Sequence, residues 1–308
     1  MSARYKQRGV ALITAVLVVA IGTMIAVNLM WEGTLDLRRA ESALAADQGL
    51  MYGQGAEAWA ADILLQDLVD SPDTDHLSEQ WAVELPPLPV DGGTITGKLE
   101  DLQGRFNLNN LIAANGMESQ LVRRQFERLL NLVEIDPGLA GAVVDWLDPD
   151  TELRFPTGGE DVVYSAQDPP YRTANAMITS ASELMAIAGF DRESYQRLAP
   201  YVTVLPHGTK LNVNTASDVL LASLSDNIDI ATAGTLIEER AGAEFVDIDA
   251  TFSGLVDPDV LAEIDGVSEH FLLTATVTLG SNQLTMRSVL QRDRSGITRA
   301  LFRSLGVE

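Results

Sequence analysis

The chain has 308 residues and carries 44 acidic against 21 basic side chains, for a formal net charge of -23. Such a surface repels the phosphates of nucleic acids and anionic lipids, and it attracts cations. The chain has no cysteine, which excludes disulfides and thiol or zinc-cysteine chemistry. Its length allows one membrane anchor together with one large or two modest domains.

The first predicted element is an apolar helix near the N-terminus. No residue between Arg8 and Glu32 is charged, and about 20 helical residues cross the roughly 30 Å hydrocarbon core of a membrane. A cleaved secretory signal usually has a shorter apolar stretch. Basic residues precede this stretch and acidic residues follow it, so the positive-inside bias predicts a cytoplasmic N-terminus and an exported remainder. These features alone also fit an ordinary single-pass anchor.

The residues before this helix form a short basic leader that ends in Gly9 and is followed at once by VALIT. This leader resembles that of type IV pilins and secretion pseudopilins. The resemblance implies that prepilin peptidase cuts after Gly9 and that the new N-terminal residue, Val10, is methylated. Most such subunits have a glutamate at the fifth mature position, which is Thr14 here. A subunit without this carboxylate lacks the usual pairing group for a neighbour's amino terminus, as expected where no neighbour lies above it.

A continuing helix is predicted from Trp31 to about Val69, because apolar residues recur at three- and four-residue spacing without a proline. The segment GQGAEA, residues 53–58, has the outline of a dinucleotide-binding fingerprint, but no predicted strand precedes it. We interpret its glycines as sites of close packing or of a kink. Clusters of proline and glycine then interrupt the pattern.

Strand patterns occur in two places that are far apart in the sequence. Alternation runs from Thr94 to Leu99, and the same character returns at 270–280 and 285–293, with a tail at 296–306 that completes a meander. About 160 mainly helical residues lie between them. We therefore expect an α+β fold with a pilin-like arrangement: a long N-terminal helix and a small antiparallel sheet, with a large, mainly helical domain inserted in the sheet region.

Part of the predicted insert, residues 211–255, resembles a helix-hairpin-helix repeat, a motif often used to hold DNA phosphates. It lacks the basic, glycine-rich loop that such contacts need, and Glu238, Glu239 and Glu244 crowd the area. We interpret it as a packing module. The predicted boundaries are a leader at 1–9, a transmembrane segment at 10–31, the pilin helix and first strands at 32–106, the inserted domain at 107–265, and the remaining strands and tail at 266–308.

Six phrases in order resemble one family, the K-type minor pseudopilins of the type II secretion system. They are DLQGRFNLNNL (101–111), VVDWLDPD (143–150), GGEDVVY (158–164), PPYRTAN (169–175), SASEL (180–184) and LNVNTAS (211–217). With the leader they cover most of the chain, and the missing glutamate at Thr14 is itself a trait of that family. The resemblance implies a subunit at the pseudopilus tip that initiates or caps assembly for export across the outer membrane. It also implies I- and J-type minor pseudopilins as partners, an inner-membrane anchor, a periplasmic domain and no nucleic-acid partner.

Acidic residues concentrate between positions 145 and 161 around a single Arg154. Carboxylates packed so closely repel one another unless they are solvated or bridged by a hard cation. The spacing imitates the start of an EF-hand loop, but Leu153 and Gly159 occupy the positions of its glycine and final glutamate. The residues alone leave a solvated turn and a cation site open, and the family resemblance implies bound calcium. The expected side-chain ligands are Asp148, Asp150, Glu160 and Asp161, with Asp145 and Asn175 as weaker candidates.

No catalytic motif accompanies these features: the chain has no Gly-x-Ser-x-Gly, P-loop or zincin sequence, and its three histidines show no partner spacing. The sequence therefore predicts a structural subunit and not an enzyme. Two alternatives remain. One is a minor pilin for DNA uptake or adhesion, suggested by the resemblance of residues 211–255 to a helix-hairpin-helix repeat. The other is an anchored periplasmic hydrolase that uses the acidic segment 145–161, called the acidic loop below.

Overall fold

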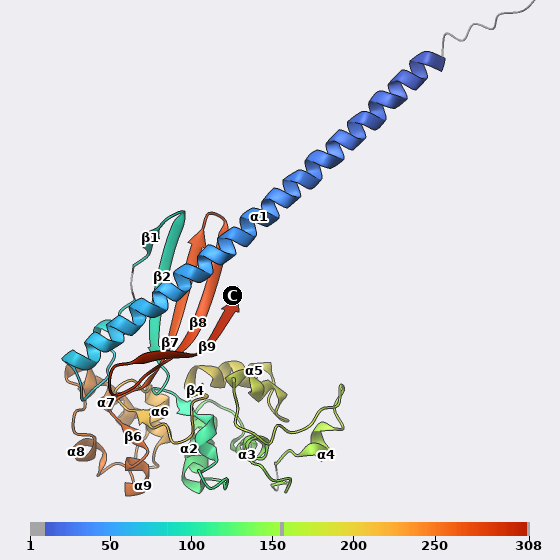
Figure 1. The fold of residues 1–308 in the computed structure, drawn as a ribbon. Helices are drawn as coiled ribbons and strands as arrows, with labels where there is room; N and C mark the ends of the chain where they lie inside the picture. The colour runs from blue at the N-terminus through green and yellow to red at the C-terminus, as the bar shows by residue number, and fades with distance from the viewer. Residues whose placement is uncertain (1–9, 85, 155–156, 307–308) are drawn as a thin grey trace, which may run out of the picture.

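The computed structural model describes residues 10–84, 86–154 and 157–306. One long helix, α1 (Val10–Asp70), crosses a five-stranded sheet of order β1-β2-β7-β8-β9. The shorter helices gather beyond the end of the sheet that lies away from the start of α1 (Figure 1). The expected architecture, a long N-terminal helix and a small antiparallel sheet with a mainly helical insert, is confirmed.

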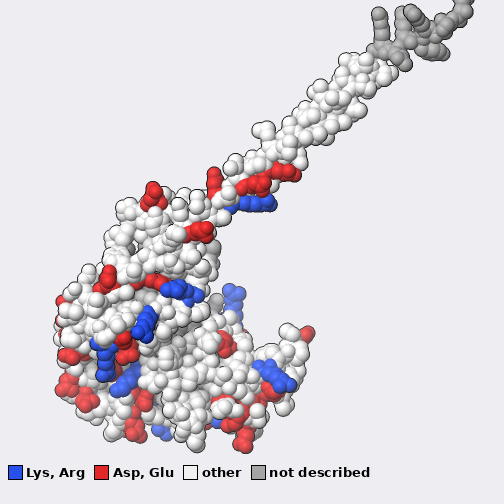
Figure 2. Space-filling model, in the orientation of Figure 1, with Lys and Arg blue, Asp and Glu red and all other residues white. Residues whose placement is uncertain are grey.

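Helix α1 has an exposed apolar half and a half that packs on the sheet. An 18-residue window near its start has a mean hydropathy of 2.7, and this window is not buried by any other part of the described chain. Figure 2 shows no charged side chain along the apolar half of α1 until the group of red and blue residues just before the helix reaches the folded part. Farther along, a Cβ added to Gly53 would lie 3.0 Å from the Met286 side chain of the sheet. Gly53 therefore fits the packing interpretation, whereas the space around Gly55 is open.

The sheet is antiparallel throughout, and the insert enters between two neighbouring strands. Strand β2 pairs with β7 from Gly93 opposite Leu279 to Asp101 opposite Phe271, so the chain from 102 to 269 leaves and returns at adjacent positions. The strands are β1 (Leu88–Val90), β2 (Gly93–Asp101), β7 (His270–Leu279), β8 (Asn282–Arg292) and β9 (Thr298–Gly306).

The insert has a hydrophobic core of its own, in which Phe126, Leu129 and Leu184 are fully buried. Ser217 caps α6 by accepting a hydrogen bond from the backbone N–H of Leu220. The helices are α2 (Gln120–Leu132), α3 (Ala140–Leu147), α4 (Asp161–Tyr164), α5 (Arg192–Leu198), α6 (Asp218–Ser223), α7 (Ile230–Gly242), α8 (Ile248–Phe252) and α9 (Pro258–Leu261).

Two short parallel strand pairs within the insert were not predicted. They are β3 (Phe106–Asn107) with β4 (Val202–Thr203), and β5 (Leu211–Asn212) with β6 (Ile264–Asp265). Strands of two residues are too short to show the alternation on which strand prediction depends.

Buried polar groups join the insert to the sheet. The Asn212 side-chain amide donates to Asp101 Oδ2 at 3.2 Å, to Ser268 Oγ at 2.8 Å and to the Asp75 carbonyl at 2.9 Å. Burial raises the pKa of Asp101 to about 6. Asn212 thus links the end of β2, the segment before β7 and the loop that follows α1.

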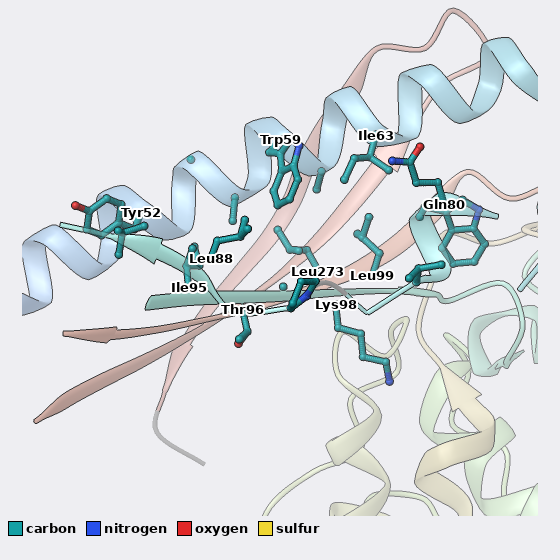
Figure 3. Close-up of a pocket in the computed structure, with 18 residues that line it drawn as sticks. Tyr52, Trp59, Ile63, Gln80, Leu88, Ile95, Thr96, Lys98, Leu99 and Leu273 are labelled. Carbon is teal, nitrogen blue, oxygen red and sulfur yellow. The ribbon is translucent and has the colours of Figure 1, made fainter. Parts of the chain in front are cut away.

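An apolar cavity of about 210 Å³ separates α1 from the β1-β2 edge of the sheet. In Figure 3, Trp59 and Ile63 project from α1 toward Leu99 and Leu273 of the sheet. Helix-to-sheet packing is therefore incomplete on this side.

Candidate metal site

The acidic loop follows α3 at the end of the insert drawn farthest from α1 (Figure 1). The Asp148, Asp150 and Glu160 carboxylates each place one oxygen within 4.8 Å of the others. Oxygens that share a calcium ion at 2.3–2.6 Å lie within roughly 5 Å of one another. Three of the four predicted ligands therefore converge.

Two of these three carboxylates are buried. Asp148 is 1% and Glu160 3% exposed, whereas Asp150 is exposed. Asp148 Oδ1 and Glu160 Oε1 have no hydrogen-bond partner among the described residues, whereas Asp148 Oδ2 forms an ion pair with Arg154. Burial raises the pKa of Asp148 and of Glu160, and neighbouring carboxylates act in the same direction. A cation at this position would offset both effects.

Arg154 reaches into this group of carboxylates. Its guanidinium forms an ion pair with Asp148, lies 2.7 Å from Asp145 Oδ1 and bonds Glu118 Oε2 at 3.1 Å. Its backbone N–H also donates to Asp145 Oδ2 at 3.1 Å. Both oxygens of the Asp145 carboxylate thus accept hydrogen bonds from Arg154. The acidic spacing gave no signal for Glu118, which comes from a distant part of the sequence.

Asp161, the fourth predicted ligand, is not part of the converging group. Its Oδ1 accepts from the Thr173 backbone N–H at 3.2 Å, and its Oδ2 lies 3.8 Å from Arg172. Asn175 is placed better than expected, because its side chain donates to the Asp150 carbonyl at 2.9 Å while its own Oδ1 is buried without a hydrogen-bond partner. Its φ of 45° is left-handed, a conformation that asparagine tolerates.

The available donors fit a hard divalent cation. They are carboxylate and amide oxygens, without sulfur or imidazole, which is the set that calcium prefers. Two glycines give the loop its close approach. A Cβ on Gly158 would collide with Asp145 Oδ2, and one on Gly159 would lie 2.7 Å from the Tyr164 hydroxyl.

The predicted processing site is described only from Val10 onward, where α1 begins, and Gly9 lies outside the described residues. Thr14 Oγ1 donates to the Val10 carbonyl at 3.1 Å and to the Ala11 carbonyl at 3.0 Å. The hydroxyl is therefore satisfied within its own helix.

Comparison with known proteins agrees with this architecture. Two family models, both described as type II secretion system (T2SS), protein K, match residues 104–207 and 211–261, respectively. The type II secretion system protein K of Pseudomonas aeruginosa is 34% identical over 98% of this chain and 94% of its own length. That of Aeromonas hydrophila is 32% identical over 94% of each chain. This chain belongs to the type II secretion system protein K family. As a family member it is a minor pseudopilin. The one helix of membrane-spanning length and composition among its described residues is compatible with a single-pass anchor.

A solved structure of the family has the same fold. A chain in the crystal structure of the GspK-GspI-GspJ complex from enterotoxigenic Escherichia coli matches with a TM-score of 0.79 and 26% identity. The match covers 88% of this chain and all of the other one.

Proposed function

We propose that this minor pseudopilin occupies the tip of the type II secretion pseudopilus, where it initiates or caps filament assembly. The observation that carries the proposal is the position of the insert at the end of the molecule away from the start of α1 (Figure 1). A further subunit stacked there would meet the insert and not a pilin sheet. Thr14 supports the same position, because a hydroxyl bonded within its own helix offers no carboxylate to a neighbour's amino terminus.

The absence of cysteine makes a direct test simple. One cysteine introduced at Ser295, in the exposed β8-β9 turn, accepts a gold label on the full chain. Electron microscopy of pseudopili assembled with the labelled subunit should show one label at one end. Labels repeated along the filament would refute the tip position.

We further propose that I- and J-type minor pseudopilins are its partners, as in the complex from Escherichia coli. The outer face of α1 offers a fitting surface. Leu37, Leu44 and Met51 recur every seven residues and are 66%, 61% and 71% exposed. A seven-residue apolar repeat on an exposed helix face is suited to packing against another helix.

Charged residues on this face should prevent co-assembly without unfolding the subunit. We expect the Leu44→Asp/Met51→Asp variant to lose co-purification with the I- and J-type subunits, because two carboxylates would be desolvated at a helix-helix contact. The melting temperature should stay within a few degrees of wild type, since both side chains are exposed. Arg38→Asp on the same helix is the control. Unimpaired co-purification of the double variant would exclude this face.

The acidic loop is proposed to bind calcium through Asp148, Asp150 and Glu160, with Asn175 Oδ1 as a further ligand and Asp161 as a residue that supports the loop. The support is the convergence of their oxygens and the unpaired buried atoms described above. Bound calcium would pin a long loop and balance carboxylates that Arg154 alone does not neutralise.

Calcium bound at the acidic loop should stabilise the wild-type chain. The Asp150→Asn/Glu160→Gln variant should lose this contribution to stability. At a calcium concentration about 100 times the dissociation constant, a single site adds about 2.7 kcal/mol to the free energy of unfolding. Titration calorimetry and thermal melting with and without chelator measure both quantities. Glu152→Gln, in the same loop but outside the converging group, is the matched control. Calcium binding that survives in the double variant with unchanged affinity at the loop would refute this ligand set.

We propose that α1 anchors the chain in the inner membrane with its N-terminus in the cytoplasm and the folded part in the periplasm, as the charge asymmetry favours. Cleavage after Gly9 and methylation of Val10 by prepilin peptidase belong to the same proposal. The intact mass of the purified chain tests it, because the mature form should begin at a methylated Val10.

A structural role is proposed over catalysis and over DNA uptake. In the helix-hairpin-helix-like segment, residues 211–255, the start of α7 is capped by Asp229. Its carboxylate accepts a hydrogen bond from the Thr232 backbone N–H at 2.7 Å. A carboxylate thus occupies the helix N-terminus where a phosphate would bind. A gel-shift assay tests DNA binding, and tight, salt-sensitive binding would favour the alternative.

A further inference from the structure

A second group of carboxylates lies where α1 ends, far in the fold from the acidic loop of the insert. Asp67 belongs to the last turn of α1, and Asp75 and Glu79 belong to the segment that follows it. One carboxylate oxygen from each residue lies within 4.8 Å of the others. All three residues are buried, with 7%, 1% and 8% exposure.

One guanidinium pairs with two of these three carboxylates. Arg292 donates from Nη1 to Asp67 Oδ2 at 2.8 Å and from Nη2 to Asp75 Oδ1 at 2.5 Å, and it also bonds the Leu64 and Ser268 carbonyls. If all three carboxylates are ionised and His76 is neutral, one guanidinium leaves an excess of negative charge in a buried place. Buried charge of this kind requires a counter-charge.

Glu79 supplies an independent observation. Its Oε2 accepts hydrogen bonds from the His76 backbone N–H at 2.9 Å and from Trp81 Nε1 at 2.6 Å. Its Oε1 is buried and has no hydrogen-bond partner among the described residues. His76 Nε2 lies 3.3 Å from this atom, a contact that is an ion pair only when the ring is protonated. Glu79 is thus held in place by Oε2, while Oε1 accepts no hydrogen bond within the described structure and can bind a cation when His76 is neutral.

The spacing of these carboxylate oxygens fits a shared cation. Oxygens bound to one calcium ion lie within roughly 5 Å of each other. A groove of about 560 Å³ borders the group and is lined by further carboxylates, namely Asp73, Asp265, Glu269 and Asp293.

We propose that Asp67, Asp75 and Glu79 form a second divalent-cation site, selective for a hard cation such as Ca²⁺. The bound ion ties the end of α1 to the segment that leads into β1 and, through Arg292, to the end of β8. This site is independent of the calcium site proposed for the insert, because the two share no residue.

Terbium, a luminescent substitute for Ca²⁺ at oxygen sites, can report on this site through Trp81. The indole bonds Glu79 directly, so a bound ion lies close enough for energy transfer from the excited ring. The full chain in detergent micelles is used, in the Asp150→Asn/Glu160→Gln background that removes the site in the insert. We expect one bound ion and emission excited through tryptophan in this background, and calcium should compete for it.

Both signals should be lost in the same background after Glu79→Gln, whereas Glu84→Gln, in the same connecting segment, should retain them. Trp81→Phe should abolish the emission but keep the bound ion in equilibrium dialysis, and Trp146→Phe should change neither. The Trp81→Phe comparison keeps the test valid if Glu79→Gln fails to fold. No bound ion in the background variant, or emission that persists in folded Glu79→Gln, would overturn the proposal.

Discussion

Replacing Arg292 with methionine should lower the free energy of unfolding by about 3–5 kcal/mol, the usual cost of removing one partner from a buried ion pair. The Arg292 side chain is almost fully buried and bonds two carboxylates and two backbone carbonyls. Methionine keeps the apolar stem, but it leaves Asp67 and Asp75 buried without their guanidinium. The loss should be far larger than that of a surface charge.

Arg294→Met is the matched control, because Arg294 is exposed two residues farther along the same chain segment. Its effect should stay within about 0.5 kcal/mol. Denaturant unfolding of the full chain in micelles, followed by circular dichroism, measures both variants. Both variants are measured with chelator present, so that no divalent cation compensates the carboxylates. A loss below about 1 kcal/mol in Arg292→Met would then contradict the prediction.

Acidification should destabilise the wild-type chain by about 3 kcal/mol through His270 alone, because a tenfold change in proton affinity between the folded and unfolded chain corresponds to about 1.4 kcal/mol. Burial lowers the pKa of this imidazole from 6.5 to about 4. The unfolded chain therefore binds a proton that the folded chain does not between these two values. The contribution is complete above pH 6.5, falls as the pH drops toward 4, and levels off below it.

His270→Asn should remove this dependence while keeping a donor toward Gln103 Oε1, which lies 3.1 Å from the imidazole Nδ1. Lost packing changes stability equally at every pH, so the difference in slope between wild type and variant reports the proton. Unfolding free energies measured from pH 7 to pH 4 should converge between the two proteins. Parallel curves would show that His270 is protonated without cost in the fold.

The architecture was predictable because its signals are long or periodic. An uncharged run of membrane-spanning length, an Ala-rich helical continuation and alternating strands on either side of a helical stretch each extend over many residues. The pairing of β2 with β7 across the insert is expected where the strand patterns on the two sides of the insert form one sheet.

The candidate site was predictable only in part. Clustering in sequence grouped Asp148, Asp150, Glu160 and Asp161. The carboxylates of the first three converge in the structure, whereas that of Asp161 accepts a hydrogen bond from Thr173. Side-chain direction along a four-residue helix is not visible in composition.

Contacts between distant residues were missed altogether. Arg292 and Asp67 are 225 positions apart, and neither stands in a motif. Only the completed packing of α1 against β8 brings them together.

The entry and exit of the insert on paired residues of β2 and β7 make the helical domain removable in principle. Excision of 102–270 leaves Asp101 opposite Phe271 at the ends of two strands that already form a continuous ladder, and a two-residue Asn-Gly turn would close them into a β-hairpin. The product would be an ordinary pilin head. Within this architecture, acquiring or losing a capping module amounts to lengthening or shortening a single hairpin loop.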